Sequence, residues 1–550
     1  MPPPEPTAPA VASPEPPDGS ASSATRLAKS AGIIGTATLT SRVLGLVRDQ
    51  VLAFLFGAGN AMDAFYVAYR IPNLMRDLFA EGAMSAAFVP TFTRRLTQRG
   101  RASAWQLGNQ LINALVVVTA LIVLAGMVFA RPLTEGLAGA YAAVPGKLEL
   151  TVTLTRVLLP FLTLVAVAAA LMGMLNSLNK FFTPALSPAM FNVGIIFSAL
   201  VLVPVAPALG LEPIVAIAVG AMIGGVGQIA LQVPSLLREG YRYRLELSPT
   251  DPGLREILRL IGPGTLAGAA VQINLLVNTI LATGEGTGAV SWLSYAFRLM
   301  YLPIGLFGVS IATATLPAVA RYAAQAEIDR VRQTVSSAFR LMLMLTIPAM
   351  VGLIVLASPI VGLVFERGSF AASDTAATAA ALAFYAPGLL GYSAVRIGVP
   401  CFYALKDSVT PTLVSIASVA LNIVLNVILV RHMGYRGLAL GTSIAALFNA
   451  ALLFYLLRQR TGGLDSGRIL VAFVKISLAA GLMGATALSV HVWLLGVWPG
   501  ADLFVQLGRV GASIVTGLIV LVGGAHILRI HEWHHAKRQV LAKLERLRAG

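Results

Sequence analysis

Apolar segments long enough to cross a lipid bilayer follow one another along almost the whole chain. A helix needs about 20 mostly apolar residues to cross the hydrocarbon layer, and counting such segments predicts about fourteen membrane-spanning helices. They lie at residues 29–57, 61–93, 105–131, 147–178, 184–205, 213–236, 254–283, 289–320, 331–362, 375–404, 410–430, 437–458, 469–495 and 504–530. Because a helix satisfies its backbone hydrogen bonds internally, we expect an all-α integral membrane protein.

The composition excludes an ordinary soluble enzyme. Hydrophobic residues make up 57% of the 550 residues and charged residues only 12%, whereas an average soluble protein has about 25% charged residues. In a soluble chain the formal net charge of +16 would suggest a nucleic-acid partner. Here the basic residues gather in alternate loops, as membrane topology requires, so we expect no nucleic acid. The single cysteine, Cys401, excludes an intrachain disulfide framework and a cysteine-based metal cluster.

Loop charges orient the predicted helices in the membrane. If the N-terminus is cytoplasmic, the expected cytoplasmic loops hold arginines such as Arg94 and Arg238, and the C-terminal tail is also basic. Expected outer loops such as 204–213 contain no Lys or Arg, in agreement with the positive-inside rule. The outer loops that contain Arg367 and Arg431 are exceptions. We predict a multi-pass protein with both termini in the cytoplasm.

The chain contains an internal repeat. Gly57 and Gly284, and likewise Pro90 and Pro317, are separated by the same 227 residues. Because this offset spans an even number of predicted helices, the two copies have the same orientation and form parallel repeats around a central cavity. The predicted organisation is a disordered Pro/Ala-rich cytoplasmic tail (1–26), a six-helix N lobe (27–240), a six-helix C lobe (250–460), two extra C-terminal helices (467–530) and a basic cytoplasmic tail (531–550).

Charged residues inside the predicted helices are the first candidates for function, because an ionic side chain in a membrane is costly and usually faces a cavity or a partner. The candidates are Arg42, Arg48 and Asp49 in the first helix, Asp63, Arg70 and Arg76 in the second, Arg298 in the eighth and Arg396 in the tenth. A single arginine can instead extend to the interface or pair with a neighbouring carboxylate. Several arginines from both lobes favour a phosphate or diphosphate cargo, because a guanidinium binds phosphate through two hydrogen bonds.

Two further motifs are weaker. Residues 531–535 match a zinc-protease pattern, but they lie in the basic tail without an evident third ligand. Residues 284–288 lack the Lys-Ser/Thr of a phosphate-binding loop and are expected to form a turn. These motifs therefore predict neither a metal centre nor a nucleotide site, and we expect no cofactor.

Residues 41–92, from SRVLGLVRDQ to FVPTF, closely resemble the signature region of the MurJ (MviN) lipid II flippases. This family lies within the multidrug/oligosaccharidyl-lipid/polysaccharide (MOP) exporter superfamily. The resemblance continues through SYAFRLMYLPIGLFGVSIATATLPAVAR at 294–321 and FYALKDSVTPT at 402–412. It covers nearly the whole chain after the N-terminal tail.

The resemblance implies transport by alternating access rather than enzyme catalysis. The implied cargo is lipid II, the undecaprenyl-pyrophosphate-linked disaccharide-pentapeptide precursor of peptidoglycan, which moves from the inner to the outer leaflet of the bacterial cytoplasmic (inner) membrane. Matched to the family motif, the substrate-binding residues are Arg42, Arg48, Asp63, Arg76 and Arg298, with Asp49, Arg70 and Arg396 as secondary candidates. The two extra helices would form a groove for the polyprenyl tail. The implied partners are lipid II, membrane lipids and the cell-wall synthesis machinery.

The resemblance also bears on ion coupling. Some relatives are thought to bind sodium through carboxylates in the seventh and eleventh helices. The matching positions here are Asn278, Asn422 and Asn426, and Thr442 could contribute a hydroxyl oxygen. These groups are neutral, so we predict no firm metal site, and coupling to an ion or to the membrane potential stays open.

Two alternatives belong to other functional classes. A drug or small-organic-cation antiporter of the same superfamily would share the architecture. Its cationic substrate would be repelled by arginines, however, and acidic residues would be expected in the cavity instead. A non-transporting scaffold for cell-wall synthesis would have no need of arginines inside the membrane.

Overall fold

The structure, a computed structural model, describes residues 19–77, 84–248 and 250–534. Every regular element within these residues is helical, which confirms the predicted all-α class. The helices are α1 (Gly19–Phe56), α2 (Asn60–Arg76), α3 (Met84–Val128), α4 (Ala130–Ala138), α5 (Lys147–Leu158), α6 (Phe161–Ser177), α7 (Phe182–Leu186), α8 (Ala189–Val201), α9 (Pro213–Arg238), α10 (Pro252–Thr283), α11 (Ala289–Pro303), α12 (Val309–Ala324), α13 (Ile328–Val355), α14 (Ala357–Phe365), α15 (Ala372–Tyr385), α16 (Gly388–Ala404), α17 (Val409–Met433), α18 (Tyr435–Arg460), α19 (Ser466–Val497) and α20 (Leu503–Ile527). Three short turns are η2 (Gly139–Ala143), η3 (Ala206–Leu209) and the π-helical η4 (Ile304–Gly308).

Within the described residues, nine helices are long and apolar enough to cross a membrane, or ten if α15 and α16, which meet at 44°, form one span. The predicted number of about fourteen is therefore not confirmed, although every predicted range carries helix. The difference has local causes. α2 contains several charged residues, and α8 has only 13 residues. α3 merges two predicted ranges, and Gly100 interrupts it with a φ of 78°, which glycine adopts at little cost.

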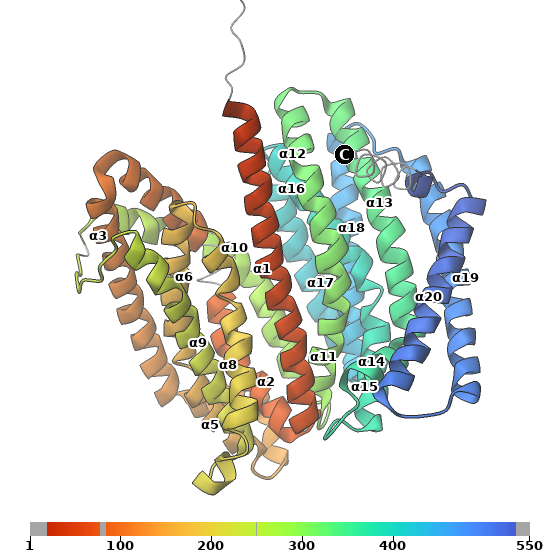
Figure 1. Ribbon diagram of the computed structural model, residues 1–550, viewed down its shortest axis with the longest axis horizontal. Helices are drawn as coiled ribbons and strands as arrows, with labels where there is room; N and C mark the ends of the chain where they lie inside the picture. Colours follow the sequence, from red (N-terminus) through yellow and green to blue (C-terminus); the bar gives the residue numbers. More distant parts are fainter. Residues whose placement is uncertain (1–18, 78–83, 249, 535–550) are drawn as a thin grey trace, which may run out of the picture.

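The helices form two lobes that lie side by side (Figure 1). In the N lobe α3 packs on α6 and α8 on α9, and in the C lobe α16 and α17 both pack on α18. α10 bridges the lobes, because it contacts α3 on one side and α17 on the other. The ribbons of the two lobes spread apart toward the end where α1 begins, which we call the splayed end (Figure 1).

The lobes meet at the opposite end, which we call the closed end. Thr287 Oγ1 donates to Asn60 Oδ1 at 2.9 Å, and these two residues are 227 positions apart, the repeat offset. Equivalent positions of a two-fold arrangement touch each other only near its axis, so this contact is the kind that the predicted repeat would produce. Beside it, the Ser369 N–H donates to the Phe54 carbonyl at 2.8 Å. Gly57, at a φ of 59°, packs so closely on the Ser369 backbone that no Cβ would fit.

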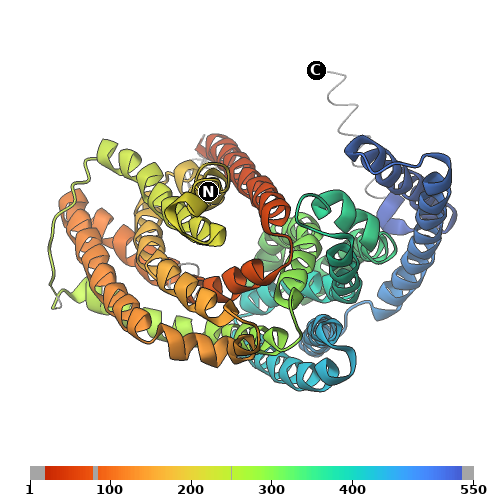
Figure 2. The same ribbon diagram turned by 90° about the horizontal axis from the view of Figure 1, so that it is seen from below.

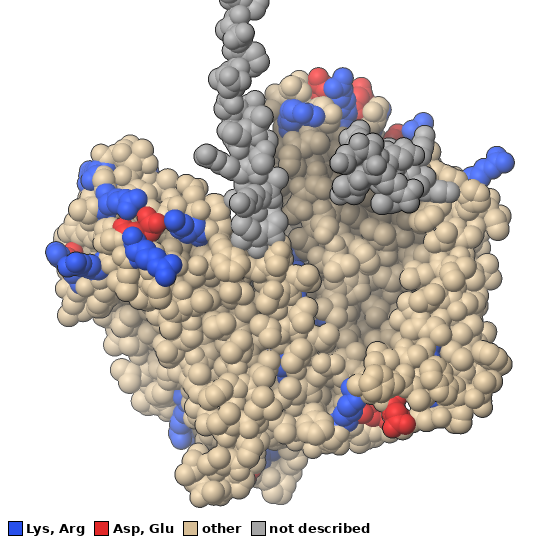
Figure 3. Space-filling view, in the orientation of Figure 1, with Lys and Arg blue, Asp and Glu red and all other residues tan. Residues whose placement is uncertain are grey.

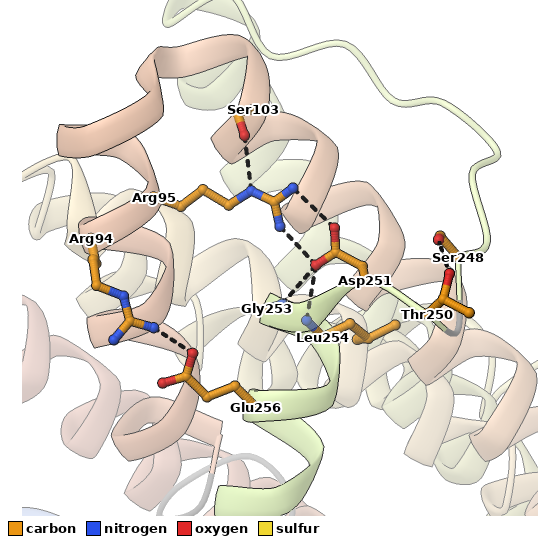
Figure 4. Close-up of polar contacts among 9 residues, drawn as sticks. All are labelled: Arg94, Arg95, Ser103, Ser248, Thr250, Asp251, Gly253, Leu254 and Glu256. Atoms are coloured by element: carbon orange, nitrogen blue, oxygen red, sulfur yellow. Dashed lines mark hydrogen bonds and ion pairs between the residues drawn. The ribbon is translucent and has the colours of Figure 1, made fainter.

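The segment that links the two lobes is fastened to the N lobe. Residues 241–248 run along α3, where Asn113 Nδ2 donates to two of their carbonyls at 3.0 and 2.9 Å. Asp251 then caps the start of α10 and pairs with Arg95 of α3 at 2.8 Å (Figure 4). Burial raises the pKa of the Asp251 carboxyl, but the hydrogen bonds from Arg95 and from two α10 backbone N–H groups outweigh burial and lower that pKa. The first turns of α10 are thus held by the N lobe.

The helices α19 and α20 form a hairpin at the outer edge of the C lobe (Figure 2). α19 packs on α13 and α20 on α14. After α20, Glu532 accepts a hydrogen bond from Arg340 Nε of α13 at 2.6 Å, and Trp533 packs against the C-lobe core. The zinc-like motif therefore contributes to an anchor for the hairpin. In the described part of the chain, no group of three His, Cys, Asp or Glu residues is placed to hold a metal ion.

The helix α1 begins at Gly19, so residues 19–26 are helical where we predicted a disordered tail. No proline occurs between Pro17 and Pro72, and the Ala- and Ser-rich sequence after Pro17 contains nothing that stops a helix. Residues 1–18 and 535–550, which make up most of the two predicted tails, lie outside the described residues.

Candidate functional site

Three charged residues of α1 and α11 join the two lobes. Arg48 donates to Oδ1 of Asp49 from Nε at 3.0 Å and from Nη2 at 2.6 Å. Arg298 of the C lobe places its Nε 2.9 Å from the other oxygen, Oδ2, of the same carboxylate. Asp49 is only 1% exposed, whereas 46% of the Arg298 side chain is exposed. One buried carboxylate is thus shared by an arginine from each lobe, and we call these three residues the arginine bridge.

The helix α8 fixes the position of Arg48. Asn192 Oδ1 accepts from Arg48 Nη1 at 3.0 Å, and Asn192 Nδ2 donates to the Ser41 carbonyl at 3.1 Å. The Phe191 ring lies below the Arg48 guanidinium at 5.6 Å, within the range of a cation–π contact. Sequence reasoning missed Asn192. Its only signal was a single amide within the apolar stretch AMFNVGIIF.

Arg42 lies against the C lobe without an acidic partner. Its guanidinium occupies the space that a Cβ at Gly305 would fill, so only glycine at this position admits it. Gly305 belongs to η4, a π-helical turn of the kind that often occurs at functional sites. Arg42 has no hydrogen bond or ion pair with any described residue. A half-buried cation of this kind is a candidate for binding an anion.

Arg70 and Arg76, the two arginines of α2, form contacts outside the arginine bridge. Arg70 Nε donates to Thr279 Oγ1 of α10 at 3.1 Å, which connects α2 with the bridging helix. Arg76 pairs with its neighbour Asp77, with Nη2 and Oδ1 separated by 2.9 Å. Neither residue contacts the arginine bridge through any hydrogen bond or ion pair that the structure shows between described residues.

Arg396 of α16 approaches the arginine bridge through a tyrosine. Its Nη2 donates to the Tyr301 hydroxyl at 2.9 Å. Tyr301 follows Arg298 by three residues in α11, so the two side chains share one face of that helix. α11 starts just after Thr287 at the closed end, so Tyr301, three residues beyond Arg298, lies farther from that end.

Asp63 is placed apart from these arginines, at the closed end. Its carboxylate accepts from Lys147 Nζ at 2.9 Å, from the N–H groups of Gly288 and Ser291 at 2.7 and 3.0 Å, and from Ser291 Oγ at 2.7 Å. Asp63 is 0% exposed. A carboxylate at a helix N-terminus is favourably placed, and here the helix, α11, belongs to the other lobe. We call Asp63, Lys147 and Ser291 the closed-end latch.

The charges inside the two lobes do not balance. Among the described residues, the arginines within reach of the interlobe region are Arg42, Arg48, Arg70, Arg76, Arg298 and Arg396, and the aspartates beside them are Asp49 and Asp77. In the space-filling view most charged side chains gather at the two ends of the molecule, and a few blue atoms lie recessed beside α1 (Figure 3). A surplus of positive charge between the lobes favours an anionic ligand.

The sodium-site candidates form an amide cluster between α10 and α17. Asn426 Nδ2 donates to Asn278 Oδ1 at 2.5 Å and to Asn422 Oδ1 at 3.1 Å. The Thr442 hydroxyl instead donates to the Leu438 carbonyl of its own helix at 2.8 Å. In this arrangement an amide N–H group of Asn426 satisfies the oxygens of Asn278 and Asn422, and no carboxylate takes part in the cluster.

The comparisons with known proteins agree on one family. Residues 52–506 match the family described as lipid II flippase MurJ. A probable lipid II flippase MurJ of Vibrio cholerae is 36% identical over 511 residues, which cover 90% of this chain and 96% of the relative. The lipid II flippase MurJ of Burkholderia cenocepacia is 34% identical over 427 residues, 77% of this chain and 82% of that protein. The chain belongs to the MurJ lipid II flippase family. The resemblance seen in the sequence is thereby confirmed, and this is a family of transporters rather than enzymes.

Solved structures support the assignment to the MurJ family. A lipid II flippase MurJ in an inward closed conformation superposes with a TM-score of 0.73 at 27% identity, covering 90% of this chain and 99% of that one. An inward-facing MATE family transporter of the MOP superfamily gives a TM-score of 0.64 at 18% identity, covering 79% and 98%. The second likeness shows a common fold only. It therefore gives no support to the antiporter alternative.

Proposed function

We propose that this protein flips lipid II from the inner to the outer leaflet of the bacterial cytoplasmic membrane, and that the lipid diphosphate binds at the arginine bridge. The observation that carries the proposal is the single carboxylate of Asp49, held between Arg48 of the N lobe and Arg298 of the C lobe. A guanidinium that holds a carboxylate by two hydrogen bonds has the geometry to hold a phosphate in the same way.

In this reading, Asp49 is an internal counter-ion that a diphosphate displaces. Without Asp49, the buried guanidinium of Arg48 would lose its anionic partner, at a cost of several kcal/mol, and the half-exposed Arg298 would lose its ion pair. The carboxylate keeps both arginines oriented before the cargo arrives, and Asn192 retains Arg48 when the carboxylate moves. Because Asp49 returns as the cargo leaves, binding stays reversible, as transport requires.

Alternating access follows from the two kinds of interlobe contact. The closed-end latch and the backbone contacts near Phe54 hold the lobes together at one end. The arginine bridge lies between that end and the splayed end. If the lobes rotate so that the latch opens and the splayed end closes, a diphosphate bound at Arg48 and Arg298 becomes accessible from the other side.

The orientation in the membrane comes from the loop charges. Three arginines flank the break in α3 at Gly100: Arg94 and Arg95 before it and Arg101 after it. Arg94 and Arg95 pair with acidic residues at the start of α10 (Figure 4). Basic residues concentrate on the cytoplasmic side of membrane proteins, so the splayed end faces the cytoplasm and the closed end faces outward. Lipid II would enter from the inner leaflet.

The helical hairpin of α19 and α20 supplies an apolar surface for the polyprenyl tail. Large exposed apolar side chains line both helices, among them Leu478, Leu482, Val515 and Ile519. A tail that stays on this surface and in the lipid needs no polar partner, whereas the charged head group does. The cell-wall synthesis machinery that consumes the exported precursor is the implied protein partner.

The test compares translocation of fluorescent lipid II in proteoliposomes by the wild type and by Arg298→Gln. We expect a loss of at least about tenfold, because a hydrogen bond to a charged group contributes about 1.5–3 kcal/mol. Arg436→Gln, which removes an exposed arginine beside Tyr435, is the matched control and should translocate normally. Full translocation by Arg298→Gln would refute the site. If neither the wild type nor any variant translocates lipid II in proteoliposomes, while cells that carry these proteins grow a normal cell wall, the scaffold alternative is favoured.

A further inference from the structure

A second cationic position lies beside the arginine bridge. The Arg396 guanidinium is exposed, and among the described residues its single hydrogen bond goes to the Tyr301 hydroxyl. No described carboxylate forms an ion pair with Arg396. Tyr301 is one helical turn after Arg298, a rise of about 4.5 Å at 1.5 Å per residue. The position is therefore separate from the bridge but continuous with it along α11.

The chemistry of the Arg396–Tyr301 pair suits an anion. Because Arg396 donates to the Tyr301 oxygen, the hydroxyl hydrogen of Tyr301 is free to donate to a further acceptor. Tyr301 is 38% exposed, so a ligand can reach that hydrogen. The guanidinium and the hydroxyl thus offer convergent donors, and both lack an anionic partner in the described structure.

Aromatic packing holds Tyr301 in place. Phe297 stacks on Tyr301 with ring centroids 5.9 Å apart and an interplanar angle of 27°. Tyr385 and Tyr392 contact the same Phe297 ring edge-on. A tyrosine supported on one face by such a cluster keeps its hydroxyl at a fixed position, which favours specific binding over a merely charged surface.

The balance of positive and negative charge around the arginine bridge indicates which ligand group suits this position. Arg42, Arg48, Arg298 and Arg396 stand against Asp49, which leaves an excess of positive charge. A lipid diphosphate carries one negative charge on each phosphate and neutralises most of this excess, but not all of it. The two phosphates share a bridging oxygen and lie close together at the arginine bridge. A further anionic group of the same cargo, farther along the head group, would neutralise the remainder.

We infer that Arg396 and Tyr301 form a second subsite, which binds a carboxylate of the peptide stem while the diphosphate occupies the arginine bridge. The inference rests on the proposed function, since it assumes that lipid II is the cargo. The subsite selects cargo with a complete head group, because a lipid diphosphate without the peptide leaves Arg396 without a counter-ion.

The experiment measures the affinity of purified protein in lipid nanodiscs for three probes. They are undecaprenyl diphosphate, lipid II with free peptide carboxylates, and lipid II whose peptide carboxylates have been converted to amides. The variants are Arg396→Gln and Tyr301→Phe, with Arg396→Lys as the conservative change and Arg436→Gln as the control. Arg436 contacts Tyr435, so the control removes a comparable Arg–Tyr pair elsewhere on the C lobe.

We expect Arg396→Gln to weaken binding of carboxylate-bearing lipid II by about tenfold, the worth of one charge-assisted hydrogen bond. Binding of undecaprenyl diphosphate should not change, and the amidated probe should bind wild type and variant equally. Tyr301→Phe should give a smaller loss with the same selectivity, and Arg396→Lys should restore part of the affinity. Equal losses for all three probes would overturn the inference and assign Arg396 to the diphosphate or to structure. An unchanged affinity for every probe would also overturn it.

The variant Arg298→Gln separates this inference from the proposed function. It should weaken binding of all three probes, because each carries the diphosphate. If Arg298→Gln leaves all three affinities unchanged, the diphosphate site itself is refuted. If it acts as expected while Arg396→Gln shows no preference among the probes, only the second subsite fails.

Discussion

The arginine bridge and the closed-end latch are both built on a buried aspartate that joins the two lobes, yet their surroundings differ. Asp63 accepts four hydrogen bonds and pairs with a lysine that is itself buried. Asp49 is shared by two arginines, one of which is half exposed. A fully satisfied carboxylate is suited to holding a closed state, whereas one carboxylate between two cations is suited to being exchanged for another anion.

The largest expected effect comes from Asp63→Ala in the latch. The change leaves the Lys147 ammonium buried without a partner, and removing one member of a buried ion pair costs about 3–5 kcal/mol. The closed end should open, and lipid II translocation should fall to near background. Distances between spin labels at positions 60 and 287 would report the opening. The single native cysteine, Cys401, is buried, which simplifies such labelling.

A double variant, Asp63→Ala with Lys147→Met, separates loss of the latch from a failure to fold. It removes the unpaired buried charge, so most of the thermal stability should return. The spin-label distance should stay long, because the bonds to Gly288 and Ser291 are still missing. A distance that returns to the wild-type value would show that Asp63 does not hold the lobes together.

At the arginine bridge we expect a variant that binds the lipid diphosphate more tightly than the wild type. Asp49→Asn removes the internal counter-ion from Arg48 and Arg298, so an added anion no longer competes with it. Affinity for undecaprenyl diphosphate should rise by about tenfold, which corresponds to 1.4 kcal/mol. Translocation should nevertheless slow, because the cargo is released less readily. Binding by titration calorimetry checks the first statement, and weaker binding would contradict the role of Asp49 as a displaced anion.

The smallest effect is expected from Gly305→Ala. The added methyl group occupies the place of the Arg42 guanidinium, and this flexible side chain must move away from the C lobe. We expect a several-fold loss of translocation, with little change in thermal stability. Gly511→Ala is the matched control, since a Cβ at Gly511 in α20 meets no atom within 4 Å. Equal activity of both variants would show that the position of Arg42 against Gly305 is unimportant.

Much of the fold could be predicted from the sequence. The apolar segments predicted the helices, and the offset of 227 residues predicted a two-fold relation with which the contact between Asn60 and Thr287 agrees. The number of spans was harder to predict, because α2 carries several charges, α8 is short, and α3 continues past the kink at Gly100. The start of α1 at Gly19 was missed because the prediction of disorder rested on the low content of large apolar residues. A helix can still form in such a segment where no proline interrupts it.

The candidate site was predicted by residue type but not by grouping. Intramembrane charge identified Arg48, Asp49 and Arg298, and the structure brings these three together. The same signal selected Asp63, which lies in a different cluster at the closed end. Which charges meet depends on how each helix is rotated and where it crosses its neighbours, and neither is encoded in hydropathy. Lys147, at the start of α5, had no signal beyond its type.

The central claim is that the diphosphate of lipid II takes the place of the Asp49 carboxylate between Arg48 and Arg298. A cryo-electron microscopy structure of the protein in nanodiscs with lipid II bound tests it most directly. The account predicts phosphate oxygens within hydrogen-bond distance of both guanidinium groups, with the Asp49 carboxylate moved away from Arg298. A diphosphate bound elsewhere, with Asp49 still bridging the two arginines, would contradict it.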